Sequence, residues 1–347
     1  MTQRLGGMRV VRLNATLFPP SDFERAEWAR AGLAPVEAEA NTAEALIPLV
    51  AEADGVFAIS VALPAPVVAA MARCRVISRL GTGTDKIDVA LATRRGILVT
   101  NVPTFCIEEQ ADHTMALLLA LVRKLPVMQR AMRAGAFNAA QGLSRSNQRM
   151  AGQTLGLVGF GNSARLTAQR ARGFRLRVLA TRRSAAPIDP ALGVELCDLD
   201  RLLRESDYVS LHLPLAAATY HMMGAAQFAA MKPGALFINT SRGALVDEDA
   251  LEAALRSGHL GGAGLDTYER IDVFAERPPM PRWSLLELDQ VIATPHVAAN
   301  SVQAGQDVAR GGIENLAAVL SGHWPRPGQI VNAGVVPRVA LAPWPGG

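Results

Sequence analysis

Short hydrophobic segments alternate with longer amphipathic segments along the first third of the chain. The hydrophobic segments predict strands at residues 8–13, 55–59, 76–80 and 97–102. The amphipathic segments predict helices at residues 22–31, 42–52, 66–73 and 87–95, with Ser21, Asn41 and Thr42 at positions typical of helix N-caps. Strand–helix alternation of this kind is typical of a parallel sheet covered by helices on both faces.

A very apolar helix, predicted at residues 108–124, separates this part from a second alternating part. Its sequence EEQADHTMALLLALVRK is too apolar for a solvated surface, so we interpret it as a buried connector between two lobes. After a polar stretch at residues 141–150, strands are predicted at residues 154–158, 177–180, 208–212, 235–239, 262–265 and 291–293. A last helix near residues 301–320 is predicted to return to the first lobe, and the tail after Gly322 to be irregular.

Length and composition agree with two folded α/β domains. The chain has 347 residues, of which 50% are hydrophobic, and this excludes a disordered or fibrous protein. The longest apolar run, residues 115–122, is far shorter than the roughly 20 residues that cross a bilayer, and we expect no secretory signal. The distant Cys74, Cys106 and Cys197 match neither a disulfide framework nor a zinc ribbon. We therefore expect a cytoplasmic protein with no metal and no membrane partner.

The positive charge does not by itself indicate a partner. The formal net charge is +4, but lysine occurs only at Lys86, Lys124 and Lys232, so nearly all of the 35 basic residues are arginines. Such an arginine excess can reflect genome composition alone. No dense basic run with interleaved aromatic residues occurs, as a nucleic-acid surface would show, so we expect no nucleic-acid partner.

A glycine-rich turn follows the strand predicted at residues 154–158. The turn has the pattern G-x-G-x-x-A, and its residues are Gly159, Phe160, Gly161, Asn162, Ser163 and Ala164. Between a strand and a helix, the first glycine allows a tight turn, the second admits a pyrophosphate, and the alanine lets helix pack on strand. Three small residues at this spacing also occur in plain strand–helix turns, but the context favours a bound dinucleotide.

The end of the next strand indicates which dinucleotide is bound. In NAD sites an acidic residue there binds the ribose 2′-hydroxyl, whereas this chain has Thr181, Arg182 and Arg183. Arginine supplies charge and a planar fork for a 2′-phosphate, so the sequence favours NADP(H) over NAD(H). The alternative is that these are two more surface arginines in an arginine-rich chain.

Arg242, Asp266 and His296 follow the ends of three later predicted strands. In open parallel sheets, ligands bind beyond the carboxyl ends of the strands, so the three side chains are predicted to share one site. Hydride exchange with a 2-oxo acid needs a cation for the carboxylate, a proton donor, and a group that orients the nicotinamide. These three residue types supply that chemistry, although a single histidine at a strand end is often only structural.

These segments resemble motifs of a known family, the D-isomer-specific 2-hydroxyacid dehydrogenases. The motifs are VGFGNSA, LHLPLAAAT, INTSRGALVDEDAL, GAGLDTYE and ATPHVAANS, within a resemblance that runs from residue 81 to residue 332. Residues 101–125 are most similar to the branch of C-terminal binding proteins and phosphoglycerate dehydrogenase-like enzymes. The resemblance implies two Rossmann-like lobes: a doubly wound nucleotide-binding domain at residues 105–297 and a discontinuous, flavodoxin-like substrate domain at residues 1–104 and 298–347. It also implies a homodimer formed through the nucleotide-binding domain.

The resemblance also implies roles for individual residues. Arg242 would bind the substrate carboxylate, His296 would be the acid/base, and Thr82 and Gly83 would offer backbone donors to the same carboxylate. Asp266 would contact the nicotinamide end of the cofactor. Further residues beside the cofactor would be Gln110, Leu213, Pro214, Thr219 and Thr240.

The chain departs from the family at one catalytic position. The family pairs its histidine with a glutamate five positions after the aspartate, where this chain has Ile271, and the segment that follows is about six residues longer than usual. Glu269, Asp272 and Glu276 are the alternative carboxylates, and we rank Glu269 first. A histidine without a carboxylate partner would have a lower pKa.

The substrate is predicted mainly by exclusion. No Arg or Lys occurs between residues 31 and 72, where the family's phosphoglycerate dehydrogenases hold a substrate phosphate, so we expect a non-phosphorylated 2-oxo acid. Phe57, Ile59 and Leu63 are predicted to line an apolar pocket or simply to belong to the core. The characteristic substitutions of formate dehydrogenases are absent. An alternative function is a nucleotide-sensing, corepressor-like binding module, but the retained Arg242 and His296 favour an enzyme.

Overall fold

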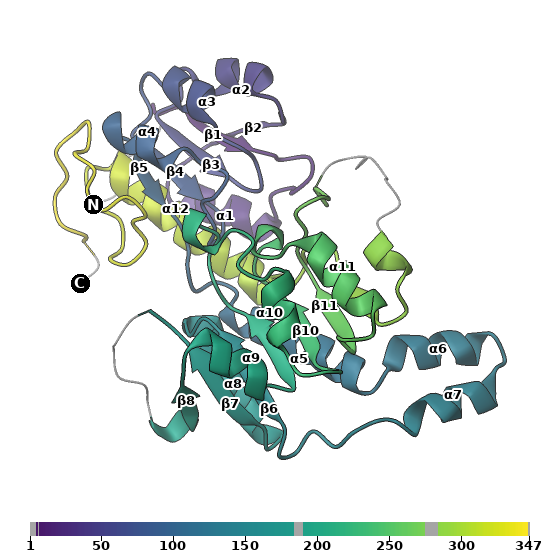
Figure 1. Cartoon of the computed structure of the whole chain (residues 1–347). Helices are drawn as coiled ribbons and strands as arrows, with labels where there is room; N and C mark the ends of the chain where they lie inside the picture. Colours follow the sequence, from purple (N-terminus) through teal and green to yellow (C-terminus); the bar gives the residue numbers. More distant parts are fainter. Residues whose placement is uncertain (1–4, 6, 184–189, 275–283, 346–347) are drawn as a thin grey trace. The chain divides into compact units, whose positions relative to one another are not determined.

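The computed structural model describes residues 5, 7–183, 190–274 and 284–345, which fold into two compact units (Figure 1). Unit 1 comprises Met1–Phe105 and Ser301–Gly347, and unit 2 comprises Cys106–Asn300. Each unit is built on its own parallel sheet, which confirms the predicted α/β class with two parallel-sheet lobes. In the described part of the chain, no helix is long and apolar enough to cross a membrane.

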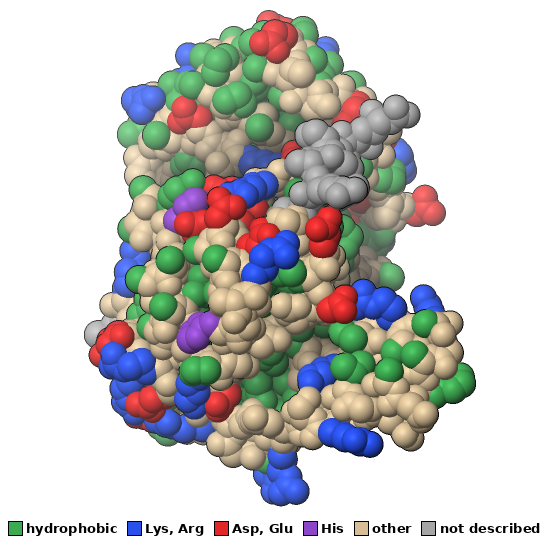
Figure 2. Space-filling model, turned by 45° about the vertical axis from the view of Figure 1, so that its right-hand side comes forward, with side chains coloured by type: hydrophobic (Ala, Val, Ile, Leu, Met, Phe, Trp, Pro, Cys, Tyr) green, Lys and Arg blue, Asp and Glu red, His purple; other side chains and the backbone are tan. Residues whose placement is uncertain are grey.

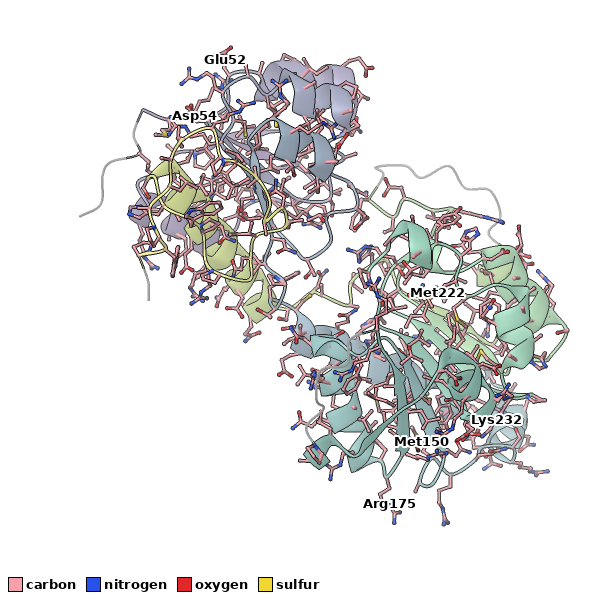
Figure 3. The ribbon with its side chains drawn as sticks, turned by 60° about the vertical axis from the view of Figure 1, so that its left-hand side comes forward. Glu52, Asp54, Met150, Arg175, Met222 and Lys232 are labelled. Atoms are coloured by element: carbon pink, nitrogen blue, oxygen red, sulfur yellow. The ribbon has the colours of Figure 1, made fainter. Side chains whose placement is uncertain are left out.

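Unit 1 contains a five-stranded sheet in the order β2-β1-β3-β4-β5, the order of flavodoxin-like doubly wound sheets. The strands are β1 (Val10–Leu13), β2 (Val36–Ala38), β3 (Gly55–Ala58), β4 (Val76–Arg79) and β5 (Leu98–Thr100). Strand β2 was not predicted, because it is a short, solvent-exposed edge strand without a hydrophobic pattern. Asp54, which directly precedes β3, marks the amino-terminal end of this sheet in Figure 3.

Among the described residues of unit 1, five helices cover the sheet: α1 (Asp22–Arg30), α2 (Ala43–Val50), α3 (Ala65–Ala70), α4 (Val89–Arg94) and α12 (Val302–Leu320). Ser21 and Thr42 cap α1 and α2 as predicted, by accepting hydrogen bonds from backbone amides of the first turn. The last helix, α12, packs on α1, β3 and β4, so it belongs to unit 1 although 195 residues of unit 2 precede it.

Unit 2 contains a seven-stranded parallel sheet in the order β12-β11-β10-β9-β6-β7-β8. The strands are β6 (Thr154–Val158), β7 (Arg177–Thr181), β8 (Val194–Leu196), β9 (Tyr208–Leu211), β10 (Leu236–Asn239), β11 (Gly262–Leu265) and β12 (Val291–Ala293). The order reverses between β6 and β9, which is where such sheets bind ligands at the carboxyl ends of their strands. Met150, Arg175 and Lys232 lie at the amino-terminal end of this sheet, and Met222 lies toward the carboxyl end (Figure 3).

The two longest helices of unit 2 in the described residues are α5 (Ile107–Val122) and α8 (Asn162–Gly173), and the shorter ones are α6 (Leu125–Arg133), α7 (Phe137–Ser144), α9 (Leu199–Glu205), α10 (Ala225–Ala230) and α11 (Glu248–Arg256). Short 3-10 turns lie at η1 (Pro190–Leu192), η2 (Ala217–Thr219), η3 (Gly243–Leu245) and η4 (Ser284–Glu287). Helix α5 is apolar because it packs on α8, β10 and β11. Helices α6 and α7 were not predicted; they form a hairpin that projects from the rest of unit 2 (Figure 1).

Candidate active site

The space around the turn after β6 explains why three of its positions hold small residues. Gly159 has φ +96°, and a Cβ on it would lie 2.4 Å from the His212 carbonyl oxygen, so only glycine fits. A Cβ on Gly161 would have no neighbour within 4 Å, so this glycine leaves open space at the surface. Ala164 is completely buried where α8 packs on the sheet.

The amino end of α8 offers backbone donors beside that open space. The first hydrogen bond into this end of the helix runs from the Arg165 amide to the Gly161 carbonyl, so the preceding amides point out of the helix end. Phe160 is buried under the Arg165 guanidinium, and Asn162 is exposed. Open space next to outward-pointing amides fits the pyrophosphate of a dinucleotide.

A buried histidine, His212, lies next to the glycine-rich turn. His212 contacts the Ser163 hydroxyl through Nδ1 at 3.3 Å and the Ser210 hydroxyl through Nε2 at 3.1 Å. Burial lowers the pKa of His212 to about 4, so the imidazole is neutral at physiological pH. His212 was not predicted as a site residue.

The end of β7 carries the residues that are predicted to bind the adenosine ribose. The Thr181 hydroxyl accepts a hydrogen bond of 3.2 Å from the Gly159 amide, which ties the strand end to the glycine-rich turn. The Nε atom of Arg182 is buried and has no hydrogen-bond partner among the described residues, whereas Arg183 is exposed. A buried, unpaired guanidinium N–H is a group that an anion would satisfy, so these residues fit a phosphate-bearing cofactor.

The segment after β9 closes into a compact turn on the same side of the sheet. The Thr219 hydroxyl donates to the Pro214 carbonyl at 2.9 Å and accepts from the Ala216 amide at 2.9 Å. The turn holds Leu213 half-buried against the hydrophobic core and leaves Pro214 exposed. Leu213, Pro214 and Thr219 therefore belong to one ordered element.

Arg242, Asp266 and His296 lie beyond the ends of three neighbouring strands, as predicted. Strands β10, β11 and β12 pair in parallel, so their carboxyl ends bring the three residues to one edge of the sheet. Arg242 is half-buried and donates from Nη1 to the Ser241 carbonyl at 2.7 Å. Its own carbonyl accepts from the Asn239 side chain at 2.8 Å, which fixes the start of this loop.

The glycine after Arg242 is required by close packing. A Cβ on Gly243 would lie 1.9 Å from the carbonyl carbon of Tyr268, so the Arg242 loop rests directly on the peptide that joins Tyr268 to Glu269. No larger residue fits there without moving one of the two segments. The position of the guanidinium therefore depends on the segment that follows β11.

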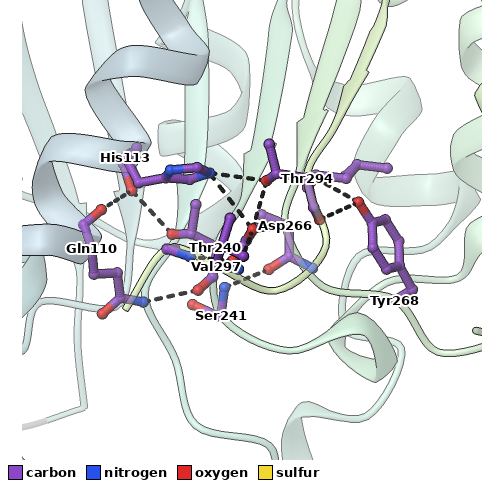
Figure 4. Close-up of polar contacts among 12 residues, drawn as sticks. Gln110, His113, Thr240, Ser241, Asp266, Tyr268, Thr294 and Val297 are labelled. Carbon is purple, nitrogen blue, oxygen red and sulfur yellow. Dashed lines mark hydrogen bonds and ion pairs between the residues drawn. The ribbon is translucent and has the colours of Figure 1, made fainter. Parts of the chain in front are cut away.

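Asp266 is completely buried, and protein donors engage both of its oxygens (Figure 4). Oδ1 accepts from the Thr294 hydroxyl at 2.5 Å and from the Val297 amide at 2.9 Å, and Oδ2 accepts from the Ala298 amide at 2.9 Å. The carboxylate thus anchors the turn that carries His296. A contact between Asp266 and the nicotinamide stays a prediction.

Three polar residues of α5 line the same part of unit 2 (Figure 4). The Gln110 amide donates to the Thr240 carbonyl at 3.0 Å, and the Thr114 hydroxyl lies 3.0 Å from the Thr240 hydroxyl. His113 contacts the Thr294 hydroxyl at 2.9 Å. His113 was not predicted as a site residue, although its spacing from Gln110 places both on one face of a helix.

His296 has φ +57°, an unusual backbone conformation for a residue other than glycine. Its amide donates to the Thr294 carbonyl at 3.0 Å, and its ring centroid lies 5.0 Å from that of Phe274. The ring is half-buried at the carboxyl end of the sheet.

The structure gives Glu269 other partners than His296. Its two carboxylate oxygens accept from the Tyr220 hydroxyl at 2.9 Å and contact His221 Nε2 at 2.6 Å. The ranking of Glu269 as the first replacement for the family's glutamate is therefore not supported. Asp272 is exposed and accepts from the Phe274 amide at 3.1 Å, and Glu276 lies outside the described residues.

In unit 1, the loop after β4 has its carbonyls turned inward. Arg79 donates to the carbonyls of Leu80 and Gly83, the Val102 amide donates to that of Gly81, and the Asn101 side chain donates to that of Thr82. In the residues that the structure describes, the amides of Thr82 and Gly83 have no acceptor. The loop therefore presents two backbone donors, the geometry expected for binding an anion.

Phe57 and Leu63 are core residues. Both are completely buried in the hydrophobic core of unit 1, and the partly buried Ile59 packs against it. Of the two alternatives for these residues, the structure supports the core for Phe57 and Leu63. They carry no information about the substrate side chain.

Known proteins resemble this chain in sequence. The family model for the D-isomer specific 2-hydroxyacid dehydrogenase NAD binding domain matches residues 115–298. A glyoxylate reductase of Korarchaeum cryptofilum is 40% identical over 79% of this chain and 81% of that protein. A D-3-phosphoglycerate dehydrogenase of Mycobacterium leprae is 38% identical over 86% of this chain and 55% of that protein.

A solved structure extends the similarity to both units. The acyclic imino acid reductase Bsp5, in complex with NADPH and D-Arg, has a TM-score of 0.80 at 25% identity, over 93% of this chain and 100% of that one. The carboxyl-edge residues, the glycine-rich turn and these similarities lead to one conclusion. The chain belongs to the D-isomer-specific 2-hydroxyacid dehydrogenases, enzymes that use a nicotinamide cofactor to interconvert 2-oxo and 2-hydroxy acids.

Proposed function

We propose that this enzyme transfers a hydride between NADP(H) and C2 of a small, non-phosphorylated 2-oxo or D-2-hydroxy acid. In this proposal unit 2 binds the nucleotide and unit 1 contributes to substrate binding. The observation that carries it is the placement of Arg242 and His296 at the carboxyl edge of the sheet that also bears the open turn at Gly161.

Each proposed residue acts through its own chemistry. Arg242 binds the substrate carboxylate, and the amides of Thr82 and Gly83 donate to the same group. When bound, the nicotinamide supplies the hydride to C2 of the oxo acid. Protonated His296 gives its proton to the carbonyl oxygen as that oxygen gains charge, and in the reverse direction neutral His296 accepts the hydroxyl proton.

The preference for NADP(H) is proposed from the end of β7. The strand ends without an acidic residue that would bind a ribose 2′-hydroxyl, and Nε of the half-buried Arg182 has no hydrogen-bond partner in the part of the chain that the structure describes. Arg182 and the exposed Arg183 offer the positive charge that a 2′-phosphate requires. Replacing Arg182 by Gln is expected to lower kcat/KM for NADPH by about tenfold to a hundredfold, the value of a charge-assisted hydrogen bond, and to change NADH turnover little.

The absence of a phosphate on the substrate is proposed from the positions of the basic residues. Residues 31–72 contain no Arg or Lys. Arg79, beside the substrate loop, donates to two carbonyls of that loop and thus serves its folding. A substrate phosphate would lack a cation from the end of β3.

A substrate screen tests the proposal directly. Glyoxylate, hydroxypyruvate, longer unbranched and aromatic 2-oxo acids and 3-phosphohydroxypyruvate are assayed with NADPH and with NADH, and the product enantiomer is determined. We expect reduction of non-phosphorylated acids to the D-product, with NADPH preferred. Equal kcat/KM for both cofactors would refute the cofactor proposal. Binding of NADPH without reduction of any acid would identify a nucleotide-binding module instead.

We also propose that two copies associate through unit 2. The projecting α6–α7 hairpin exposes Leu125, Met132 and Phe137, and Figure 2 shows hydrophobic side chains gathered on it. Exposed apolar side chains on a projecting element favour burial against a partner. Light scattering is expected to give a dimer for the wild type and a monomer for Phe137→Asp combined with Met132→Asp; a monomeric wild type would refute this proposal.

A further inference from the structure

His113 is an imidazole near the candidate acid/base that the proposed function leaves without a role. It projects from α5 toward the ends of β11 and β12 (Figure 4). Its Nε2 lies 2.9 Å from the Thr294 hydroxyl and 3.6 Å from Asp266 Oδ1. Its side chain is 22% exposed, whereas that of Asp266 is completely buried.

The direction of each hydrogen bond follows from the groups that take part. The Asp266 carboxylate accepts, so the single hydrogen of the Thr294 hydroxyl points to Oδ1 at 2.5 Å. The hydroxyl oxygen then has only lone pairs for His113, and Nε2 of His113 must be the donor. His113, Thr294 and Asp266 therefore form a directed chain of hydrogen bonds that ends on a buried carboxylate.

The same carboxylate holds the turn that carries His296. Its oxygens accept from the Val297 and Ala298 amides, which directly follow His296. His296 itself has φ +57°, a conformation that persists only where the surroundings hold it. The orientation of the His296 ring thus depends on Asp266, and that of Asp266 on Thr294 and His113.

We propose that His113 is a positioning residue for His296. Through Thr294 and Asp266 it fixes the turn that presents the imidazole for proton transfer, so its loss lowers kcat more than it weakens cofactor binding. Proton transfer is sensitive to such changes, because misplacing a reacting group by about 1 Å can lower the rate about a hundredfold. The inference rests on the proposed acid/base role of His296.

Loss of His113 is expected to leave the fold intact. Gln110 and Thr114 bind the Thr240 segment, and the apolar face of α5 packs on α8 and the sheet. Of these three polar residues of α5, His113 is the one that contacts Thr294, which directly follows β12. A substitution there therefore removes the link to the His296 turn and keeps the anchoring of the helix.

The test compares variants along the chain of hydrogen bonds. His113→Leu removes the donor, His113→Gln keeps a neutral donor near the Nε2 position, and Thr294→Val breaks the next link. We expect His113→Leu to lower kcat about tenfold with the Kd of NADPH within twofold of wild type, and His113→Gln to restore kcat to within threefold. The matched control, His259→Leu, changes an imidazole at the opposite end of the sheet and is expected to retain wild-type kcat.

Coupling between the two positions decides whether they act as one chain. If they do, His113→Leu combined with Thr294→Val lowers kcat no further than Thr294→Val alone. Independent, multiplying effects, or a wild-type kcat in His113→Leu, would overturn the proposal.

Amide hydrogen exchange of residues 294–298 gives a readout that needs no turnover. Exchange of this segment is expected to rise in His113→Leu and Thr294→Val and to stay unchanged in His259→Leu. If no oxo acid is reduced by the wild type, the proposed function fails, and exchange still decides whether His113 holds the turn. Unchanged exchange in His113→Leu would overturn the positioning role in either case.

Discussion

The two halves of the carboxyl edge in unit 2 are built on different principles. After β6 the backbone sets the shape of the site, because Gly159 fits against a neighbouring carbonyl and Gly161 leaves space beside outward-pointing amides. After β10, β11 and β12 contacts between distant residues set the shape of the site. Buried Asp266 anchors the turn that carries His296, and the segment after β11 packs against the Arg242 loop. The first half is specified by a few adjacent residues, and the second by residues distant in sequence.

The difference teaches where each half is vulnerable. At Gly159 a single added Cβ disrupts the turn, because the backbone carbonyl that it meets cannot move away at low cost. A network of side chains loses activity gradually, because each residue positions another one, and in the proposed function that other residue contacts the substrate. The substitutions below separate the loss of a backbone-built turn from the loss of a side-chain contact, beginning with Arg242.

The largest effect is expected for Arg242→Gln. Loss of a charge-assisted pair with the substrate carboxylate costs about 3–5 kcal/mol, which corresponds to a fall in kcat/KM of about a hundredfold to a thousandfold or more. Steady-state kinetics with the best 2-oxo acid measure it, and the Kd of NADPH is expected to stay unchanged. Arg204→Gln, an exposed arginine on α9, is the matched control. A fall of less than tenfold would mean that another cation binds the carboxylate.

Gly159→Ala and Gly161→Ala separate the two functions of the glycine-rich turn. The Cβ on Gly159 would approach a backbone oxygen to 2.4 Å, so this variant is expected to lose stability without cofactor and to bind NADPH about a hundredfold more weakly. The Cβ on Gly161 has open space around it, so the cofactor-free protein is expected to keep its melting temperature and lose only affinity. Equal melting temperatures of both variants would contradict this distinction.

The sequence was sufficient where the information is local. The spacing of Gly159, Gly161 and Ala164 predicts a turn that the structure contains, and alternating segments predict most strands. Hydrophobic periodicity did not find β2, because an exposed edge strand has no buried face. It also did not find the α6–α7 hairpin, whose helix α6 buries no residue.

The sequence was insufficient where the site depends on tertiary contacts. The partners of Glu269 are Tyr220 and His221, which lie almost fifty residues earlier in the chain. No spacing rule relates such positions. The neutral state of His212 likewise results from burial, which its own segment does not indicate. Candidate residues could be named from strand ends, but their pairing required the fold.

His212 is expected to make the stability of unit 2 depend on pH. Its folded-state pKa of about 4 lies below the ordinary 6.5, so between these values the unfolded state binds more protons. The contribution of His212 to the free energy of unfolding is therefore fully present above pH 6.5. It is lost on acidification toward pH 4, which lowers the free energy of unfolding by up to about 3 kcal/mol. Urea unfolding at pH 7, 5.5 and 4 is compared for wild type and His212→Gln, which lacks this slope.

The control for that measurement is His259→Gln, a half-buried imidazole at the other end of the sheet. It is expected to keep the wild-type slope between pH 4 and 6.5. If His212→Gln keeps that slope as well, then His212 is protonated in the folded protein and does not support the cofactor turn as a neutral ring.

The smallest effect on activity is expected for Glu269→Gln. Both oxygens of Glu269 are engaged by Tyr220 and His221, so the pH dependence of kcat is expected to match the wild type. The hydrogen bond from Tyr220 and the negative charge of Glu269 raise the pKa of Tyr220, and the substitution is expected to lower that pKa again, which ultraviolet titration of tyrosinate detects.

Asp272→Asn and Glu276→Gln complete this last comparison, since they remove the other two carboxylates named as alternatives to Glu269. A shift of the kcat profile toward lower pH in one variant would identify the carboxylate that favours protonated His296, because losing a nearby negative charge lowers the pKa of an imidazole. A shift in Glu269→Gln would show that this residue acts on His296 despite its partners in the structure. With all three profiles unchanged, His296 would receive its proton without help from these carboxylates. The side-chain half of the site would then differ from the family in chemistry as well as in sequence.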